Sequence, residues 1–384
     1  MSINRKIQHR TFPQNTKTQY VQNNIVDFIM AAPGRAYVPG SCRIEGNLLC
    51  NLTGTTVKIV ANDIYMDKFA GANSLFVNID TSSTKLGSWE SLQNAPRYNK
   101  MIYTGMATTA DAMNSHNIVE LRGPTDDYTK DILNGEKIVG TATHGVTNIQ
   151  SPTSFSCKPA FCLNQVGATI PGGDNSIQFD SVGSLTVKFR LAINEDVFFG
   201  QDAAAANYIL SNLSLSFESV PGSAKQAPVM IRTAQLVRQT MQSSFSSMST
   251  NVNGQIGSVA ISFLDQAKEN DAEYNTLDLD KVPNVSRVEY LFNDNSQKFI
   301  TFPLETQEEM LSHYLESISD SDNNSFTLGN IKANEGYGLG VSFYQFIDLS
   351  SNKFGLNLKS GIASNGAPSS YILFAYFLGA FSIP

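Results

Sequence analysis

The sequence has little of what active sites are usually built from. Its 384 residues include four Cys, four His and one Trp. No GxSxG, HExxH or GxxxxGKS/T motif occurs, and the His residues are scattered. The cysteines form no CxxC pair and no Cys/His spacing typical of zinc; they are Cys42, Cys50, Cys157 and Cys162. These absences predict no catalytic residues, no metal site and no cofactor, and therefore a protein that is not an enzyme.

Long apolar runs and a targeting segment are also missing. No run reaches the roughly 18 apolar residues that span a bilayer. The first ten residues, "MSINRKIQHR", lack the apolar stretch of a secretory signal. We therefore expect a protein made in a reducing cytoplasm, whose cysteines are unpaired core residues.

Charge is scarce and unevenly placed. Charged residues make up 16% of the chain, and the formal net charge is −7. Residues 226–384 hold 9 basic and 16 acidic residues, whereas residues 1–225 balance. This distribution argues against a globally basic nucleic-acid-binding protein. The first 26 residues contain no acid but four cations, Arg5, Lys6, Arg10 and Lys17, and are typical of a basic arm.

What the chain has in abundance is the period-two alternation of half-buried strands. Apolar residues alternate over 185–193, 259–263 and 354–358. The clearest helix is predicted at Thr306–Ser319, where Thr306 and Glu309 have capping-box spacing, and a shorter one at Tyr98–Tyr103. A chain of this length exceeds one ordinary core. We therefore expect two antiparallel sandwiches with few helices.

A seam at Pro221–Pro228 separates the two predicted sandwiches. "YILSNLSLSFESVP" at Tyr208–Pro221 lies 163 positions before "YILFAYFLGAFSIP" at Tyr371–Pro384, and the two share Tyr, Ile, Leu, Ser and Pro positions. If this repeat reflects duplication, each copy is the last strand of a domain. The predicted organisation is a basic arm at 1–24, a first domain at 25–220, a linker at 221–230 and a second domain at 231–384.

Several weaker motifs have simpler structural interpretations. "GYGLGVSF", with Gly336, Gly338 and Gly340, leads into a strand, so glycines that let a strand bend are favoured over a dinucleotide site. Asp320–Asn324 begins like a calcium loop, but Ser325 replaces the turn Gly and Ile331 the bidentate Glu. The acidic run Asp271, Glu273, Asp278 and Asp280 is predicted to be exposed loop.

The order of segments carries a family resemblance. "SLFVNIDTSSTKLGSWESLQNAPRYNKMI" resembles a stretch of the double jelly-roll major capsid proteins of tailless icosahedral viruses, the tectivirus and adenovirus lineage with its polinton-like and virophage-like branches. The residues that fill the family pattern are Leu75, Phe76, Glu90, Leu92, Tyr98 and Met101. Residues 180–220, 284–318 and 336–362 resemble the closing strands of barrel one and the helix and penultimate strands of barrel two.

The resemblance implies an all-β fold of two consecutive antiparallel eight-stranded jelly rolls, a double jelly roll with few short helices. It implies a capsid protein whose homotrimers form pseudo-hexagonal capsomers that tile an icosahedral shell. The partners would be neighbouring trimers, penton proteins and minor capsid proteins, in a virion made in the host cytoplasm. Arg5, Lys6, Arg10 and Lys17 would then form either an inner-face tether to an internal membrane or genome, or a disordered tail.

Two functions from other classes compete with this interpretation. A carbohydrate-binding β-sandwich, such as a lectin or adhesin, has only Trp89 for sugar stacking, a poor calcium loop and no signal peptide. A glycoside hydrolase needs two facing carboxylates, which the sequence neither identifies nor excludes.

Overall fold

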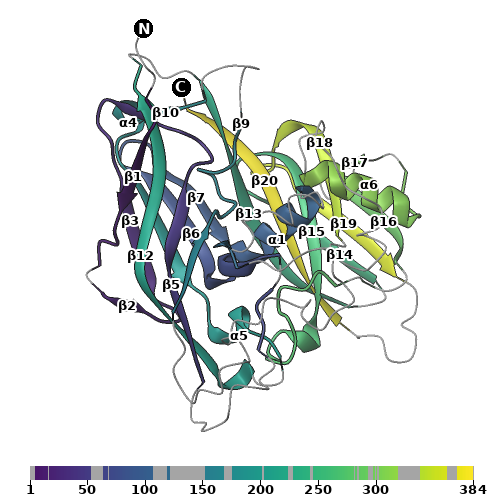
Figure 1. The fold of residues 1–384 in the computed structure, drawn as a ribbon. Coiled ribbons are helices and arrows are strands. Elements are labelled where there is room, and N and C mark those ends of the chain that lie inside the picture. Colours follow the sequence, from purple (N-terminus) through teal and green to yellow (C-terminus); the bar gives the residue numbers. More distant parts are fainter. Residues whose placement is uncertain are drawn as a thin grey trace.

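The computed structural model describes the greater part of the chain. The described residues are 5–15, 17–52, 64–67, 69–106, 119–121, 152–167, 175–200, 203–223, 228–242, 245–280, 282, 285–292, 297–298, 300, 302–318, 338–360 and 370–383. They form two barrels that lie side by side, with helix α1 between them (Figure 1). The calcium-like loop at 320–331 and Gly336 lie outside the described residues.

The first barrel is built from two sheets. In one, the order is β10-β4-β12-β5-β8, and β1 and β2 also pair with β12. In the other, the order is β3-β11-β6-β7. The strands are β1 Ile7–Thr11, β2 Gln19–Tyr20, β3 Ile25–Met30, β4 Arg35–Tyr37, β5 Arg43–Leu52, β6 Phe76–Ser83, β7 Gly87–Gln93, β8 Thr153–Cys157, β10 Ile177–Gln178, β11 Leu185–Leu191 and β12 Ala206–Pro221.

The second barrel is also built from two sheets, with fewer additional short strands. One sheet has the order β18-β15-β20-β13-β9 and the other β14-β19-β16-β17. The strands are β13 Val229–Gln242, β14 Phe245–Thr250, β15 Gln255–Asp265, β16 Val285–Phe292, β17 Gln297–Lys298, β18 Leu339–Asp348, β19 Phe354–Ser360 and β20 Ser370–Ile383. The short β9, Val166–Gly167, comes from the first half of the chain and pairs with β13.

The two barrels correspond strand by strand. The eight strands β13–β20 occupy the places of β1, β3, β5, β6, β7, β8, β11 and β12, two four-stranded antiparallel sheets in each case. The last strand, β12 or β20, lies between the first and third strands of its barrel. This is the double jelly roll expected from the sequence.

The correspondence extends to residue register. In the first barrel Ser219 of β12 pairs with Ile7, and in the second Ser382 of β20, 163 positions later, pairs with Met230. Strand β1 is therefore the counterpart of β13. The predicted arm at residues 1–24 thus contains two strands of the first barrel's sheet, because β1 and β2 hydrogen-bond to β12 instead of leaving the fold.

Only two helices reach three turns among the described residues. Helix α6, Gln307–Ile318, is preceded by Thr306, whose hydroxyl accepts from Glu309 N at 3.3 Å, while Glu309 Oε2 accepts from Thr306 N at 3.2 Å. The predicted capping box is confirmed. Helix α1, Ala95–Met106, is longer than the predicted Tyr98–Tyr103. The described residues also include two short α-helices, α4 Phe179–Val182 and α5 Asn194–Val197.

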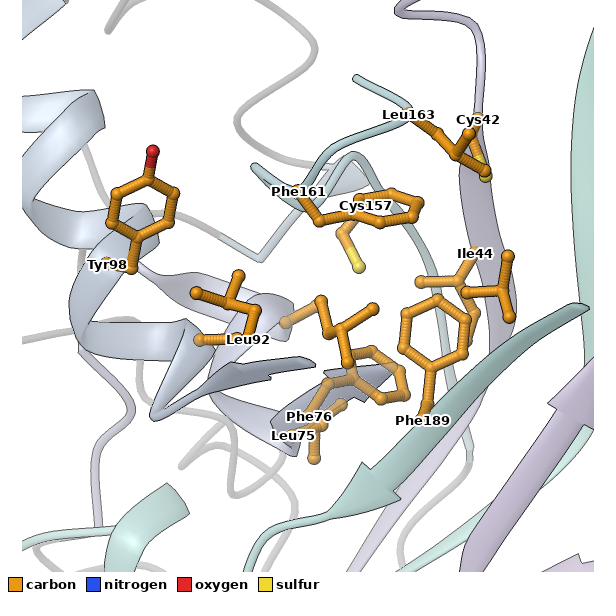
Figure 2. Packing of buried hydrophobic residues seen from close by; sticks show 14 of the residues in the cluster. Cys42, Ile44, Leu75, Phe76, Leu92, Tyr98, Cys157, Phe161, Leu163 and Phe189 are labelled. Atoms are coloured by element: carbon orange, nitrogen blue, oxygen red, sulfur yellow. The ribbon is translucent and has the colours of Figure 1, made fainter. Parts of the chain in front are cut away.

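Aromatic rings and small thiols fill the first barrel's interior (Figure 2). The ring centroid of Phe189 lies 5.2 Å from that of Phe76 and 6.3 Å from that of Phe161. All four cysteines are free and buried, as expected for small core residues, and burial raises the pKa of Cys50 to about 12. Strand β11 buries Leu185, Val187, Phe189 and Leu191 but ends there, so Ile193 is exposed despite continuing the alternation.

Candidate functional site at the junction between the barrels

The outer face of the second barrel's β20 sheet is covered by the first barrel. On β20, Ile372, Phe374 and Tyr376 belong to the same buried cluster as the first barrel's core. The alternate residues Leu373, Ala375 and Phe377 belong to the second barrel's own core. A strand buried on both faces has no polar alternation. This explains the continuous apolar run "YILFAYFL", which alternation alone could not interpret.

Helix α1 supplies the central contact of this junction. Arg97 is fully buried, and its guanidinium donates to the carbonyl oxygens of Thr276 at 2.5 Å and Asp278 at 2.9 Å. The same guanidinium lies 4.2 Å from the ring centroid of Phe374. Burial lowers the pKa of Arg97 from its ordinary value, but the carbonyl bonds and the aromatic ring compensate the buried charge. Arg97 therefore joins the two barrels directly.

A buried ion pair lies beside Arg97. The ammonium of Lys100 is 2.5 Å from Asp67 Oδ2 and 3.6 Å from Asp278 Oδ1 of the second barrel. Asn275 also donates to Asp67 Oδ2, at 2.7 Å. Burial alone would raise the pKa of Asp67, but Lys100 and these hydrogen bonds lower it overall. The Asp67 carboxylate therefore bonds to side chains from both barrels and holds the barrels together.

The acidic run at 271–280 is only partly the exposed loop that the sequence predicted, since Glu273 is exposed but the other three acids are half-buried. Asp278 and Asp280 are half-buried and pair with Lys268 at 3.3 Å and 2.6 Å. Asp278 also faces Lys100, as described above. The sequence showed the acids but not the two lysines that the fold brings to them.

Glu90 connects three segments with one buried carboxylate. Its Oε2 accepts from Cys162 N at 2.7 Å, and its Oε1 accepts from Ala234 N of β13 at 2.9 Å. Burial raises the pKa of Glu90 to about 7, although these bonds oppose the rise. The family resemblance singled out Glu90 and Tyr98 but not their role. Tyr98 also lies at the junction, with its ring centroid 5.2 Å from that of Tyr376.

Three of the four cations of the predicted tether, Lys6, Arg10 and Lys17, have separate polar partners within the chain. Lys6 pairs with Glu218 at 3.1 Å and Arg10 with Glu45 at 2.7 Å, both on the outward face of the β12 sheet. Lys17 donates to Asn24 Oδ1 at 3.2 Å. The backbone carbonyl of Arg5 accepts from Arg35.

The other residues that the sequence singled out take part in packing or in local contacts. Trp89 is only 7% exposed and packs edge-on against Phe381, so it offers no face to a sugar. Gly338 and Gly340 lie directly beneath α6, where a Cβ would meet Tyr314 or Ser317, so close helix packing requires them rather than a strand bend. His9 stacks on Phe217, and His313 lies 3.4 Å from Glu316.

The described part of the chain holds neither a cluster of metal ligands nor a helix suited to span a membrane. Within it, no three His, Cys, Asp or Glu side chains gather where they could hold a metal ion. None of its helices combines the length and apolar character that crossing a bilayer requires.

Solved structures that resemble this chain include virus capsid structures. The chain superposes on a quasi-atomic model of the PBCV-1 virus capsid with a TM-score of 0.56 and 10% identity, covering 100% of this chain and 96% of the other. The virophage Sputnik structure gives 0.58 and 11%, covering 98% and 86%, and the mavirus major capsid protein gives 0.54 and 8%, covering 98% and 90%. No protein-family model and no curated protein sequence matches the chain. At these identities the likeness establishes the fold: the chain is a double jelly roll of the kind seen in these viral capsid structures.

Proposed function

We propose that the protein is a viral major capsid protein and acts by shape rather than by catalysis. The observation that carries the proposal is the pair of equivalent barrels fixed by the junction of Arg97, Lys100 and Glu90. A rigid two-lobed unit suits a lattice, because its outline must be the same in every copy. The structures with this fold that resemble the chain are capsid structures, one named a major capsid protein. Its proposed location is therefore the virion.

The proposed assembly unit is a homotrimer. Two similar lobes per chain, repeated about a threefold axis, give six lobes and a nearly hexagonal outline that can tile a shell. Contacts with penton proteins, minor capsid proteins, an internal membrane or a genome stay predictions.

Light scattering on the purified full chain tests the trimer. We expect the mass of three chains at micromolar concentration, and hexagonal outlines in negative-stain electron microscopy. A stable monomer would contradict the proposal. A monomer that bound one sugar selectively in a glycan screen would instead support the carbohydrate-binding alternative, which no contact among the described residues favours.

A further inference from the structure

The junction within one chain provides a template for the contact between chains. We propose that residues 302–308, here called the α6 corner, dock on the free edge of β1 in a second copy of this chain. The inference deepens the proposed trimer and rests on it. It assigns the interface to particular residues, which the proposed function alone does not do.

The template is the turn from β7 into α1. This turn lies on β13, where Glu90 Oε1 accepts from Ala234 N at 2.9 Å. Next to it, Trp89 packs against Phe381, the residue of β20 that pairs with Ile231 of β13. The first barrel thus presents this turn to the first strand of the second barrel.

The second barrel has an equivalent turn, the α6 corner. Leu92 pairs with Ile79 of β6, and α1 begins three residues later at Ala95. Leu304 forms a bridge with Val288 of β16, and α6 begins three residues later at Gln307. Counting back two residues from each leucine, Phe302 holds the place of Glu90. Phe302 is 55% exposed, whereas Glu90 is 5% exposed.

The 163-residue correspondence between the barrels also identifies the strand of the second copy on which the α6 corner would dock. Ala234 of β13 pairs with Leu378, and Thr11 of β1 pairs with Leu215, the residue 163 positions before Leu378. Thr11 therefore holds the place of Ala234. Among the described strands β1 pairs with β12 alone, so its other edge has no strand partner. Ile7 at the start of β1 and Phe12 directly after its end are 39% and 64% exposed.

Phe302 and the β1 edge are therefore the two unfilled halves of one repeated contact. Exposed aromatic side chains of this size are the usual anchors of protein interfaces. Seating Phe302 beside Phe12 of a neighbour would remove both rings from water. Within the chain Glu90 and Ala234, the counterparts of Phe302 and Thr11, are already buried, so one junction per chain remains open.

The charges around the contact are complementary. Glu305 and Glu308 of the α6 corner are exposed. On the receiving sheet the side chains of Lys6 and Arg10 are 63% and 58% exposed, although each has one acidic partner in its own chain. Opposite charges of this kind set the register of a docking contact more than its strength.

Repeating the same contact from one barrel to the next also closes the assembly into a ring. Each chain supplies one internal junction and one open junction, so three chains give six junctions in a ring. A head-to-tail contact that closes in this way stops at a fixed size, whereas one that does not close forms filaments.

Disulfide trapping tests the contact in the full chain. Phe302→Cys combined with Phe12→Cys should form intermolecular disulfides, since the proposed contact seats these two exposed positions beside each other. The four native cysteines are buried, so background crosslinking is low. A non-reducing gel should show covalent dimers and trimers and nothing larger. The control pairs Phe302→Cys with Leu86→Cys, an exposed site on the β6–β7 turn, and should stay monomeric on the gel.

A second variant separates failure of this contact from failure of the trimer. Phe302→Asp should abolish the trimer in light scattering, and the matched Leu86→Asp should keep it. If the wild type is a trimer but Phe302→Asp remains one and the cysteine pair does not crosslink, the docking site is wrong and the capsid proposal stands. If the wild type is a monomer, both are overturned.

Discussion

A single ammonium, that of Lys100, neutralises the carboxylate that ties the two barrels together. Both side chains are nearly inaccessible, with 7% of Lys100 and 2% of Asp67 exposed. Lys100→Met should leave Asp67 charged and unpaired in the interior. Breaking a buried pair in this way costs about 3–5 kcal/mol of unfolding free energy, which urea denaturation would measure.

The control for Lys100 is an ion pair on the surface. Lys6 and Glu218 are 3.1 Å apart, with their side chains 63% and 41% exposed. Lys6→Met should leave the denaturation midpoint nearly unchanged, because exposed pairs are solvated and screened. Equal losses in the two variants would show that the Lys100 pair is not energetically special.

Glu90 should give the junction a pH dependence. Its pKa is raised by burial to about 7, so the folded state binds a proton that the unfolded state, with an ordinary carboxyl pKa, has already released. Stability from this group is therefore present at low pH and is lost as pH rises from about 4.5 through 7. The loss is on the order of 3 kcal/mol.

Denaturation at a series of pH values, on the wild type and on Glu90→Gln, measures this contribution. The variant cannot titrate at residue 90, so its stability should fall less between pH 5 and 8 than that of the wild type. Parallel curves for the two proteins would show that Glu90 keeps its charge throughout and that its two backbone donors outweigh burial.

Among the elements, helix α6 depends on glycines in the strand beneath it. A Cβ on Gly340 of β18 would lie 2.1 Å from Ser317 Oγ and 3.0 Å from the carbonyl oxygen of Val259. Gly340→Ala should therefore push α6 away from the sheet and cost about 1–3 kcal/mol, as overpacking does. Thermal unfolding measures the loss. Ser312→Ala, on the exposed side of α6, is the matched control and should change little.

Local sequence patterns predicted those strands and helices whose signals lie within one segment of the chain. The alternation in β11 and the capping box of α6 depend on residues within one segment, so they could be read directly. Strand β1 could not, because the residues that order it lie on β12, about 200 positions away. Likewise, Asp67, Lys100 and Asp278 become a site only when the two barrels meet. Glu90 and Tyr98 were found by family resemblance, which gave their positions but not their contacts.

At the scale of the whole molecule, the two equivalent sheet faces differ in chemistry. The outward face of the β20 sheet is apolar and permanently covered by the first barrel. The outward face of the β12 sheet carries polar side chains instead, with the pairs Lys6–Glu218 and Arg10–Glu45 and the bond from Ser216 to Glu45. An apolar face suits a junction formed once during folding, and a polar face suits one that must stay soluble before assembly.

The N-terminal strands should be part of the folding unit rather than a detachable arm. Deleting residues 1–24 removes β1 and β2, exposes the edge of β12 that they cover and takes Tyr20, which is 1% exposed, out of the core. We expect a lower soluble yield and a lower thermal midpoint, with trimers lost as a consequence. The control deletes residues 1–4 only, keeps every pairing of β1 and should match the full chain in midpoint and mass. If the longer deletion also matched the full chain in both measurements, the cations at Arg5, Lys6, Arg10 and Lys17 would belong to a dispensable arm, and strand β1 would contribute nothing to the stability of the barrel.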